Sequence, residues 1–408
     1  MKAEAIDATS QTFLQQAKAQ AEAHNWLEVT YYLQQLPIFT AKKPNRHSLA
    51  SATEAEIIHL ALQVLTQGEF QQKWQVSKLF PAIGKDAIAP LTSLIKSDSE
   101  DSETKWFAAS ILSNFKCEES VIALAALLQT TQDPDLVGIA AKSLAQIGEL
   151  AIETLIALSN IPDYRAVAAK SLAHIRLSPV LPALIELAVD KDPNIRVLAV
   201  EALGSFHSPE VVEVLIQALK DTNSSVRKEA AIALGFCHSL CDTEKLVENL
   251  EFLLKDLNLE VCRQAAISLS RMQNKPATLA LSRALKSDSI SLALKIDLVK
   301  ALAWSETDIA LDHLAVACEK ENEIICEEII NVLGRISAPQ LKHKAIAILT
   351  EYWHSSQDTI DFECKKALAT AFGELQAASA KTILQQLSTD ENKTIQLYAI
   401  SSLKKIKD

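Results

Sequence analysis

One phrase of the sequence recurs along the chain and limits it to a narrow class of folds. The segment 221–235, DTNSSVRKEAAIALG, nearly repeats the segment 190–204, DKDPNIRVLAVEALG. The apolar residue before the final glycine, here called the anchor, returns about every 32 residues, a period typical of stacked supersecondary units. The predicted anchors are Ile83, Leu112, Leu144, Leu172, Leu203, Leu234, Leu269, Leu302, Leu333, Phe372 and Leu403.

Each repeat has the pattern of two helices joined by a polar turn. The segment 211–220 is a mostly apolar helix, and the segment 226–235 places apolar residues at i, i+3, i+4 and i+7. One hairpin leaves its apolar stripe uncovered, so the repeats must stack. The sequence predicts an all-α fold, an α-α superhelix or solenoid of about eleven helical hairpins. A small residue four positions before most anchors should let second helices approach closely: Ala108, Ala140, Ala168, Ala199, Ala230, Ala265 and Ala399.

The pattern changes before residue 70. We expect an N-terminal helical cap over residues 1–69, including a loop at 38–53, followed by the solenoid over residues 70–408. Wider anchor spacings predict longer loops at 237–245 and 354–363.

Composition supports helices and argues against several classes of partner. The 408 residues include only 8 Gly and 12 Pro, and no Asn-Gly or Asp-Gly pair signals a hairpin between strands. A net charge of −11 opposes nucleic-acid binding, which depends on neutralising phosphates. The apolar run at 121–128 is too short for membrane insertion, and the first residues show no apolar leader, so we expect a cytoplasmic protein. Seven scattered cysteines fit reduced thiols.

The repeat resembles a known family. The six-residue offset in Asp190/Arg196 and Asp221/Arg227, together with A-x-x-A-L-G, resembles the HEAT repeat. Its short form of about 31 residues is similar to the HEAT-like repeats of phycobilin lyases and their cyanobacterial relatives, including non-lyase scaffolds. The resemblance covers roughly residues 70–408.

The resemblance implies a ladder of Asp and Arg between successive repeats. Cys262 follows Asp256 where an Arg would stand, and Cys326 occupies the same column behind Lys320. We therefore expect the ladder to be broken in the C-terminal half. Two interpretations of the cysteines remain: replacements of a structural Arg, which we favour, or a reactive pair.

Motifs for catalysis or metal binding are scarce. The sequence contains no His-Glu dipeptide, such as the hydroxylases of this fold carry, and no G-x-S-x-G, Walker A or G-x-G-x-x-G motif. Cys237, His238 and Cys241 could bind a metal with Cys262, but Cys237 falls on the apolar stripe, which favours a structural role. We predict no catalytic residue and no metal site.

A binding groove is predicted from helix geometry instead. The positions two and six before each anchor should point away from the core of the solenoid. They combine apolar residues with cations, which suits an acidic partner. The predicted groove residues are Trp106, Gly138, Lys142, Ala166, Lys170, Val197, Lys228, Ile232, Arg263, Ile267 and Lys300. A protein partner, a planar tetrapyrrole with its propionates, and ordinary surface all remain open, and we favour the protein partner.

These observations predict a non-catalytic, protein-binding scaffold without a cofactor. The resemblance implies a phycobiliprotein or an iron–sulfur assembly scaffold as the partner. The alternative is a phycobilin lyase or lyase subunit that attaches a bilin to a phycobiliprotein cysteine.

Overall fold

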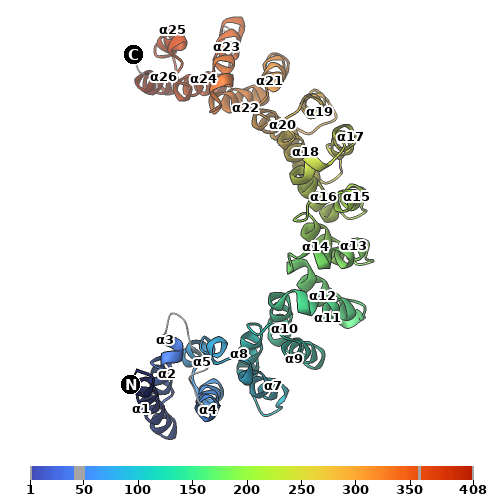
Figure 1. Ribbon diagram of the computed structural model, residues 1–408. Helices are drawn as coiled ribbons and strands as arrows, with labels where there is room; N and C mark the ends of the chain where they lie inside the picture. Colours follow the sequence, from blue (N-terminus) through green and yellow to red (C-terminus); the bar gives the residue numbers. More distant parts are fainter. Residues whose placement is uncertain (1, 41–50, 357–359, 407–408) are drawn as a thin grey trace. The chain divides into compact units, whose positions relative to one another are not determined.

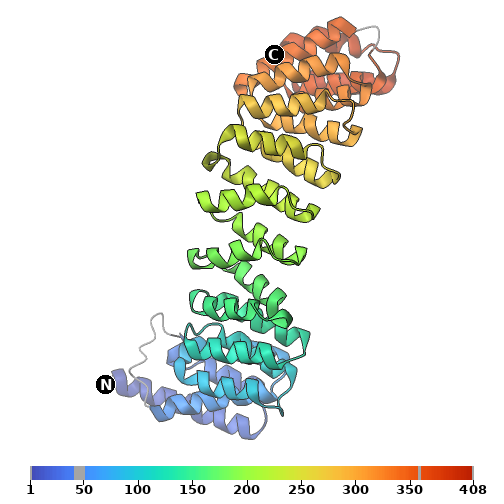
Figure 2. The same ribbon diagram turned by 90° about the vertical axis from the view of Figure 1, so that its right-hand side faces the viewer.

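The computed structural model describes residues 2–40, 51–356 and 360–406, and within them every regular element is a helix (Figures 1 and 2). The predicted all-α solenoid is confirmed. Contacts between Cα atoms divide the chain into two compact units, Met1–Leu187 and Ala188–Asp408. The predicted boundary between residues 69 and 70 lies inside the first unit and stays a prediction. Each unit is described by itself below.

Unit 1 holds the helices from the N-terminus to Leu187. Short 3₁₀ turns, labelled η, precede several of the α-helices. The elements are α1 (Lys2–Glu22), α2 (Trp26–Gln34), α3 (Pro37–Thr40), α4 (Ser51–Gln67), α5 (Phe70–Ser77), α6 (Phe80–Ile83), η2 (Lys85–Ala87), α7 (Ile88–Lys96), α8 (Ser102–Leu112), α9 (Glu118–Thr130), α10 (Pro134–Ile147), η3 (Glu149–Ala151), α11 (Ile152–Ser159), α12 (Pro162–His174), η4 (Ser178–Val180) and α13 (Leu181–Leu187).

Unit 2 continues the same alternation of first and second helices. Its elements are α14 (Pro193–Leu203), α15 (Pro209–Ala218), α16 (Ser224–Cys237), η5 (His238–Leu240), α17 (Thr243–Leu253), α18 (Leu259–Arg271), α19 (Lys275–Leu285), α20 (Leu292–Trp304), α21 (Asp308–Lys320), α22 (Glu323–Gly334), α23 (Pro339–Ser356), α24 (Phe362–Glu374), η6 (Ala378–Ala380), α25 (Lys381–Leu387) and α26 (Lys393–Lys405).

The polar turn within each repeat supplies the cap of the second helix. The side chain of Asp133 accepts a hydrogen bond from the N–H of Asp135, and Asn223 does the same for Ser225. Such caps satisfy backbone donors that have no partner inside the helix. An Asp or Asn of the polar turn therefore marks the start of most second helices; α12, with Ile161 at its N-cap, and α20, capped by Ser291, are exceptions.

Second helices pack directly on one another within each unit. In unit 1, α8 contacts α10 and α10 contacts α12; in unit 2 the row runs from α14 through every even-numbered helix to α26. The predicted small residues lie at these contacts and are at most 1% exposed. Serine hydroxyls join neighbouring helices as well: Ser143 donates to the carbonyl of Ala109, and Ser268 to that of Ala231. The first helices cover the other side of the row, which leaves one face of each second helix uncovered (Figure 1).

The structure corrects three details of the sequence pattern. The first anchor is Phe80, fully buried and seven residues after Lys73, as Leu203 follows Arg196; it begins the short helix α6, of which the predicted anchor Ile83 is the last residue. At 237–245 the additional residues extend α16 and form η5. At 354–363 they lengthen α23 to Ser356, and residues 357–359 lie outside the described part. Most of the predicted loop at 38–53, residues 41–50, also lies outside it.

Candidate functional site

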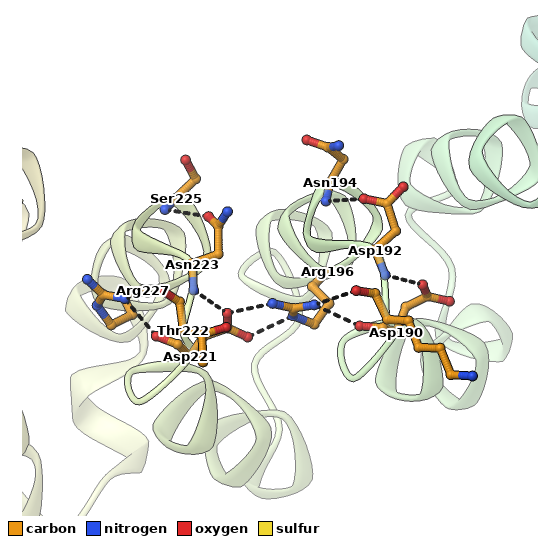
Figure 3. A network of polar contacts seen from close by, with 10 residues as sticks. Asp190, Asp192, Asn194, Arg196, Asp221, Thr222, Asn223, Ser225 and Arg227 are labelled. Carbon is orange, nitrogen blue, oxygen red and sulfur yellow. Dashed lines mark hydrogen bonds and ion pairs between the residues drawn. The ribbon is translucent and has the colours of Figure 1, made fainter.

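The Asp and Arg of the repeated phrase form a ladder in unit 2 (Figure 3). Arg196 donates from Nε to Asp221 Oδ2 at 2.8 Å and from Nη2 to Oδ1 at 2.7 Å, and its Nη1 reaches the carbonyl oxygen of Asp190 at 2.8 Å. Arg227 repeats this geometry toward Asp256 and the carbonyl of Asp221. Each Arg thus binds a carbonyl in the turn of its own repeat and a carboxylate in the turn of the next repeat.

The ladder carboxylates are held in the ionised form. Burial disfavours the charge on Asp221, but hydrogen bonds from Arg196 and from the N–H of Asn223 outweigh it and lower the pKa of the carboxyl. Asp256 has a lowered pKa for the same balance of burial against its bonds with Arg227 and Asn258. Bidentate pairing in a mostly buried setting gives these rungs a structural role.

The predicted break in the ladder is only local. Lys295 pairs with Glu321 at 2.8 Å, and Lys365 with Asp390 at 3.0 Å, so lysines continue the ladder after the missing rungs. At the first gap the Cys262 thiol donates to the carbonyl of Asp256 at 3.2 Å, the bond that an Arg makes elsewhere to the carbonyl six residues back. Cys326 donates to the carbonyl of Cys318. The Cys262 contact supports the interpretation that this cysteine replaces a structural Arg, whereas the Cys326 bond reaches a carbonyl eight residues back and does not reproduce the arginine contact.

The predicted groove residues of unit 1 lie on successive second helices. Trp106 is on α8, Gly138 and Lys142 are on α10, and Ala166 and Lys170 are on α12. Trp106 is half-buried and the other four are exposed. Within the described part of the chain, Lys142 and Lys170 form no ion pair. The structure thus places these five residues in one neighbourhood, and their role in binding stays a prediction.

Sequence reasoning missed one member of this row. Because the first anchor is Phe80, the positions six and two before it are Trp74 and Lys78 on α5, which contacts α8. Trp74 is 43% exposed, and Lys78 Nζ lies 5.2 Å from the centroid of its ring. The sequence signal that could have identified this member is the seven-residue spacing from Lys73 to Phe80, which equals the spacing from Arg196 to Leu203. The end of helix α5 at Ser77 obscures this spacing.

The predicted groove residues of unit 2 are Val197, Lys228, Ile232, Arg263, Ile267 and Lys300, on helices α14 to α20. All six are half-buried.

The cations of this set are already engaged by acidic side chains. Lys228 bonds Glu229 at 2.9 Å, which raises the pKa of the lysine. Arg263 bonds Asp297 at 2.7 Å, and Lys300 lies 3.8 Å from Glu328. These ion pairs offset the charge of the cations, and the role of this part of the row in binding stays a prediction.

The cysteine and histidine cluster around residue 237 is part of the helix end. Cys237 is fully buried, Cys241 donates to its carbonyl at 3.4 Å, and His238 Nδ1 contacts the carbonyl of Gly235. Burial raises the pKa of the Cys241 thiol to about 11, which keeps it protonated. No group of three or more His, Cys, Asp or Glu in the described residues is arranged to hold a metal ion.

The length and apolar character of the described helices bear on membrane insertion. Among the described residues, none of the helices combines the length and the apolar character needed to cross a bilayer.

Comparison with known families identifies the repeat. A model of HEAT repeats matches residues 88–173 and 152–235, and a model of the non-SMC mitotic condensation complex subunit 1 matches residues 194–348. No curated protein matches the chain.

Solved structures show the same kind of fold. Kap95p bound to RanGDP is 12% identical with a TM-score of 0.53, covering 93% of this chain and 58% of that one. The karyopherin Kap121p, bound to the extreme C-terminus of the phosphatase Cdc14p, is 12% identical with a TM-score of 0.51, covering 98% and 54%. This chain therefore spans little more than half of each.

A lyase complex is also similar to part of the chain. The complex of CpcE and CpcF of phycocyanin lyase from Nostoc sp. PCC7120 is 26% identical, with a TM-score of 0.32, and covers 36% of this chain and 97% of that one. The narrower resemblance to phycobilin lyases and their cyanobacterial relatives stays a prediction. The family match and the fold agree that this chain is a helical solenoid whose residues 88–235 match a model of HEAT repeats.

Proposed function

We propose that the chain is a non-catalytic scaffold that binds an acidic protein partner on unit 1. The binding surface consists of Trp74, Lys78, Trp106, Lys142 and Lys170, here called the tryptophan–lysine surface. The observation that carries the proposal is that its three lysines form no ion pair among the described residues, although the chain as a whole is strongly acidic. Their charge is available to a partner.

The chemistry of this surface suits a protein interface. Tryptophan supplies a large contact area at low entropic cost and is enriched among the residues that dominate binding energy. Lysines at the edge of such a contact attract a partner of opposite charge and speed its association. Trp106 is already fixed by edge-to-face packing on Phe107, at 5.3 Å between ring centroids, so little ordering remains to be done on binding.

The resemblance noted for the repeat suggests which partners to examine first. A phycobiliprotein and an iron–sulfur assembly scaffold are the two that it implies, and the bilin-lyase alternative predicts a pigment on the same surface. These possibilities differ in what an isolated complex contains, so one capture experiment separates them.

The test is affinity capture from the soluble extract of the source organism, with quantitative mass spectrometry and absorbance spectra of the eluate. The variant Trp106→Ala/Lys142→Glu/Lys170→Glu should lose at least about tenfold of the captured partner, because a deleted aromatic anchor and two reversed charges each weaken binding. The matched control is Phe252→Ala/Lys220→Glu/Lys255→Glu, which changes an aromatic residue and two lysines at the first helices of unit 2.

Capture that survives the unit 1 variant would refute the assignment of the surface. Equal loss in both variants would point to net charge instead of a site. A bilin on this chain, or newly attached to a captured protein, would replace the scaffold proposal with the lyase. Helical melting curves should be the same for all three proteins.

A further inference from the structure

A second surface lies in unit 2, at the C-terminal ends of the second helices. The residue two positions after the anchor alternates between aromatic and arginine along four successive helices, α16, α18, α20 and α22: Phe236, Arg271, Trp304 and Arg335. These helices contact one another in this order. Phe236 is 57% exposed and Trp304 is 58% exposed, and both arginines are exposed as well. We call these four residues the aromatic–arginine edge.

The two arginines of this edge differ from the other arginines of unit 2. Arg196, Arg227 and Arg263 are each bound to a carboxylate. Among the described residues Arg271 and Arg335 have no acidic partner. The guanidinium carbon of Arg271 lies 4.1 Å from the centroid of the Phe236 ring. Stacking on the ring holds the guanidinium plane and leaves its N–H donors free at the edges of the plane.

A hollow of about 470 Å³ opens beside Trp304 and Arg335, between α20, α22 and the start of α23. Val332, Ile336 and Leu341 give it an apolar wall. The hollow also contains the Lys300–Glu328 pair, whose charges offset each other, and Glu306 on one rim. It therefore offers room for an apolar side chain, with an unpaired arginine next to it.

We propose that the aromatic–arginine edge binds an extended acidic peptide segment of a partner protein. An apolar side chain of the peptide enters the hollow beside Trp304, and flanking carboxylates bind Arg271 and Arg335. Arginine forms paired hydrogen bonds with a carboxylate, which gives this contact its specificity. The edge lies in unit 2 and shares no residue with the tryptophan–lysine surface, so the inference does not depend on the function proposed above.

The geometry specifies the spacing of the acidic residues. Packed helices lie about 8–10 Å apart, so the two arginines, two helices apart, are separated by about 16–20 Å. An extended peptide advances about 3.3 Å per residue. The acidic residues should therefore be about five or six positions apart, with the apolar residue between them.

The test is selection of a random 12-residue peptide library, displayed on phage, against the full chain. Enriched peptides should carry two acidic residues about five or six positions apart around an apolar residue. Labelled copies of the enriched peptides, measured by fluorescence anisotropy, should bind Arg271→Glu/Arg335→Glu at least about tenfold more weakly. Trp304→Ala should also weaken binding, whereas Lys220→Glu/Lys255→Glu and the unit 1 variant should bind as the original chain does.

Enrichment without an acidic pair, or unchanged affinity of Arg271→Glu/Arg335→Glu, would overturn the proposal. If the charge reversal lowers the melting temperature, Arg271→Ala/Arg335→Ala replaces it in the same assay. Sedimentation velocity tests another occupant: a dimer that disappears in the arginine variant would assign this edge to a second copy of the chain, against the proposal. The proposal would also be overturned if a single-stranded oligonucleotide displaced the labelled peptide as strongly as the unlabelled peptide does.

Discussion

The second helices of both units carry cations at the positions two and six before the anchors, but these cations are used differently. In unit 1, Lys78, Lys142 and Lys170, each two positions before its anchor, have no acidic partner within the described residues. In unit 2, Lys228 and Arg263, each six positions before its anchor, are bound to Glu229 and Asp297. Lys300, two positions before its anchor, lies 3.8 Å from Glu328. These two positions therefore carry unpaired cations in the described part of unit 1 and paired cations in unit 2.

The ladder of ion pairs between successive repeats is more extensive in unit 2 than in unit 1. Unit 2 contains the two bidentate rungs from Arg196 and Arg227 and the two lysine rungs that follow. In unit 1 the corresponding positions are held by Lys73, which is almost fully buried and lies 2.9 Å from Glu103, and by Arg165, which donates to the carbonyl of Ser159, six residues back, at 3.0 Å. Under the proposed function, stability and recognition depend on different regions of one stack of similar repeats.

The largest effect on stability should come from removing a ladder arginine. Arg227→Ala leaves Asp256 partly buried without its bidentate partner and frees two backbone carbonyls, so the free energy of unfolding should fall by about 3 kcal/mol. Lys142→Ala in unit 1, an exposed cation without a partner, should change it by less than about 0.5 kcal/mol. Urea unfolding measures the free energy of unfolding of each variant, and hydrogen exchange should locate the loss of stability in residues 188–408. Equal effects in the two variants would remove the distinction between the units.

Much of the fold could be predicted because it depends on periodic features. Anchors about every 32 residues and alanines four positions before most of them fix helix order and the helix-to-helix contact, whatever the other residues are. The Asp and Arg offset also predicted a ladder, but two rungs use Lys295 and Lys365, which pair with Glu321 and Asp390 and do not match the Asp and Arg pattern. Only the stacked structure brings them together.

The candidate site was less predictable for two reasons. Helix geometry selects positions on the second helices, but it says nothing about neighbouring side chains that neutralise a cation there, such as Glu229 beside Lys228. Trp74 was missed because the helix is interrupted between Ser77 and Phe80, which shifts the apparent anchor to Ile83. Phe236 and Trp304 lie beyond the anchors, outside the positions that the core pattern specifies.

Acid should weaken unit 2 through its ladder carboxylates. Asp221, Asp256 and Asp390 have folded-state pKa values below the ordinary range, because bonds to cations and backbone N–H groups outweigh burial. Their contribution is fully present above the unfolded pKa of about 3.9 and is lost as the pH falls through the folded pKa. Urea unfolding between pH 7 and pH 3 should show this loss, and Asp221→Asn should show a smaller dependence on pH. An unchanged pH dependence in that variant would exclude this rung as a source.

A smaller effect should come from the close contact between second helices. Unit 2 has glycines directly after several anchors, where unit 1 has Ser113, Ala145 and Ala173. A Cβ on Gly334 would lie 2.6 Å from Ala371 Cβ and 2.8 Å from its Cα, so the packing of α22 against α24 would have to shift. Gly334→Ala should therefore destabilise the protein by about 1–2 kcal/mol, despite the better helix propensity of alanine. Thermal melting measures this loss of stability. The control is Gly138→Ala, which has open space around its Cβ position and should not be destabilised.

The smallest effect tests how the ladder tolerates its gaps. Cys262 donates a weak hydrogen bond to the carbonyl of Asp256, and burial raises the pKa of its thiol, so a neutral donor is all that the position requires. Cys262→Ser keeps a donor of similar size and should change the free energy of unfolding by less than about 1 kcal/mol, whereas Cys262→Ala removes the donor and should cost more. Urea unfolding under reducing conditions compares the two variants. A serine variant less stable than the alanine variant would show that the position selects an apolar side chain instead of a donor, and that Cys262 does not substitute for the ladder arginine.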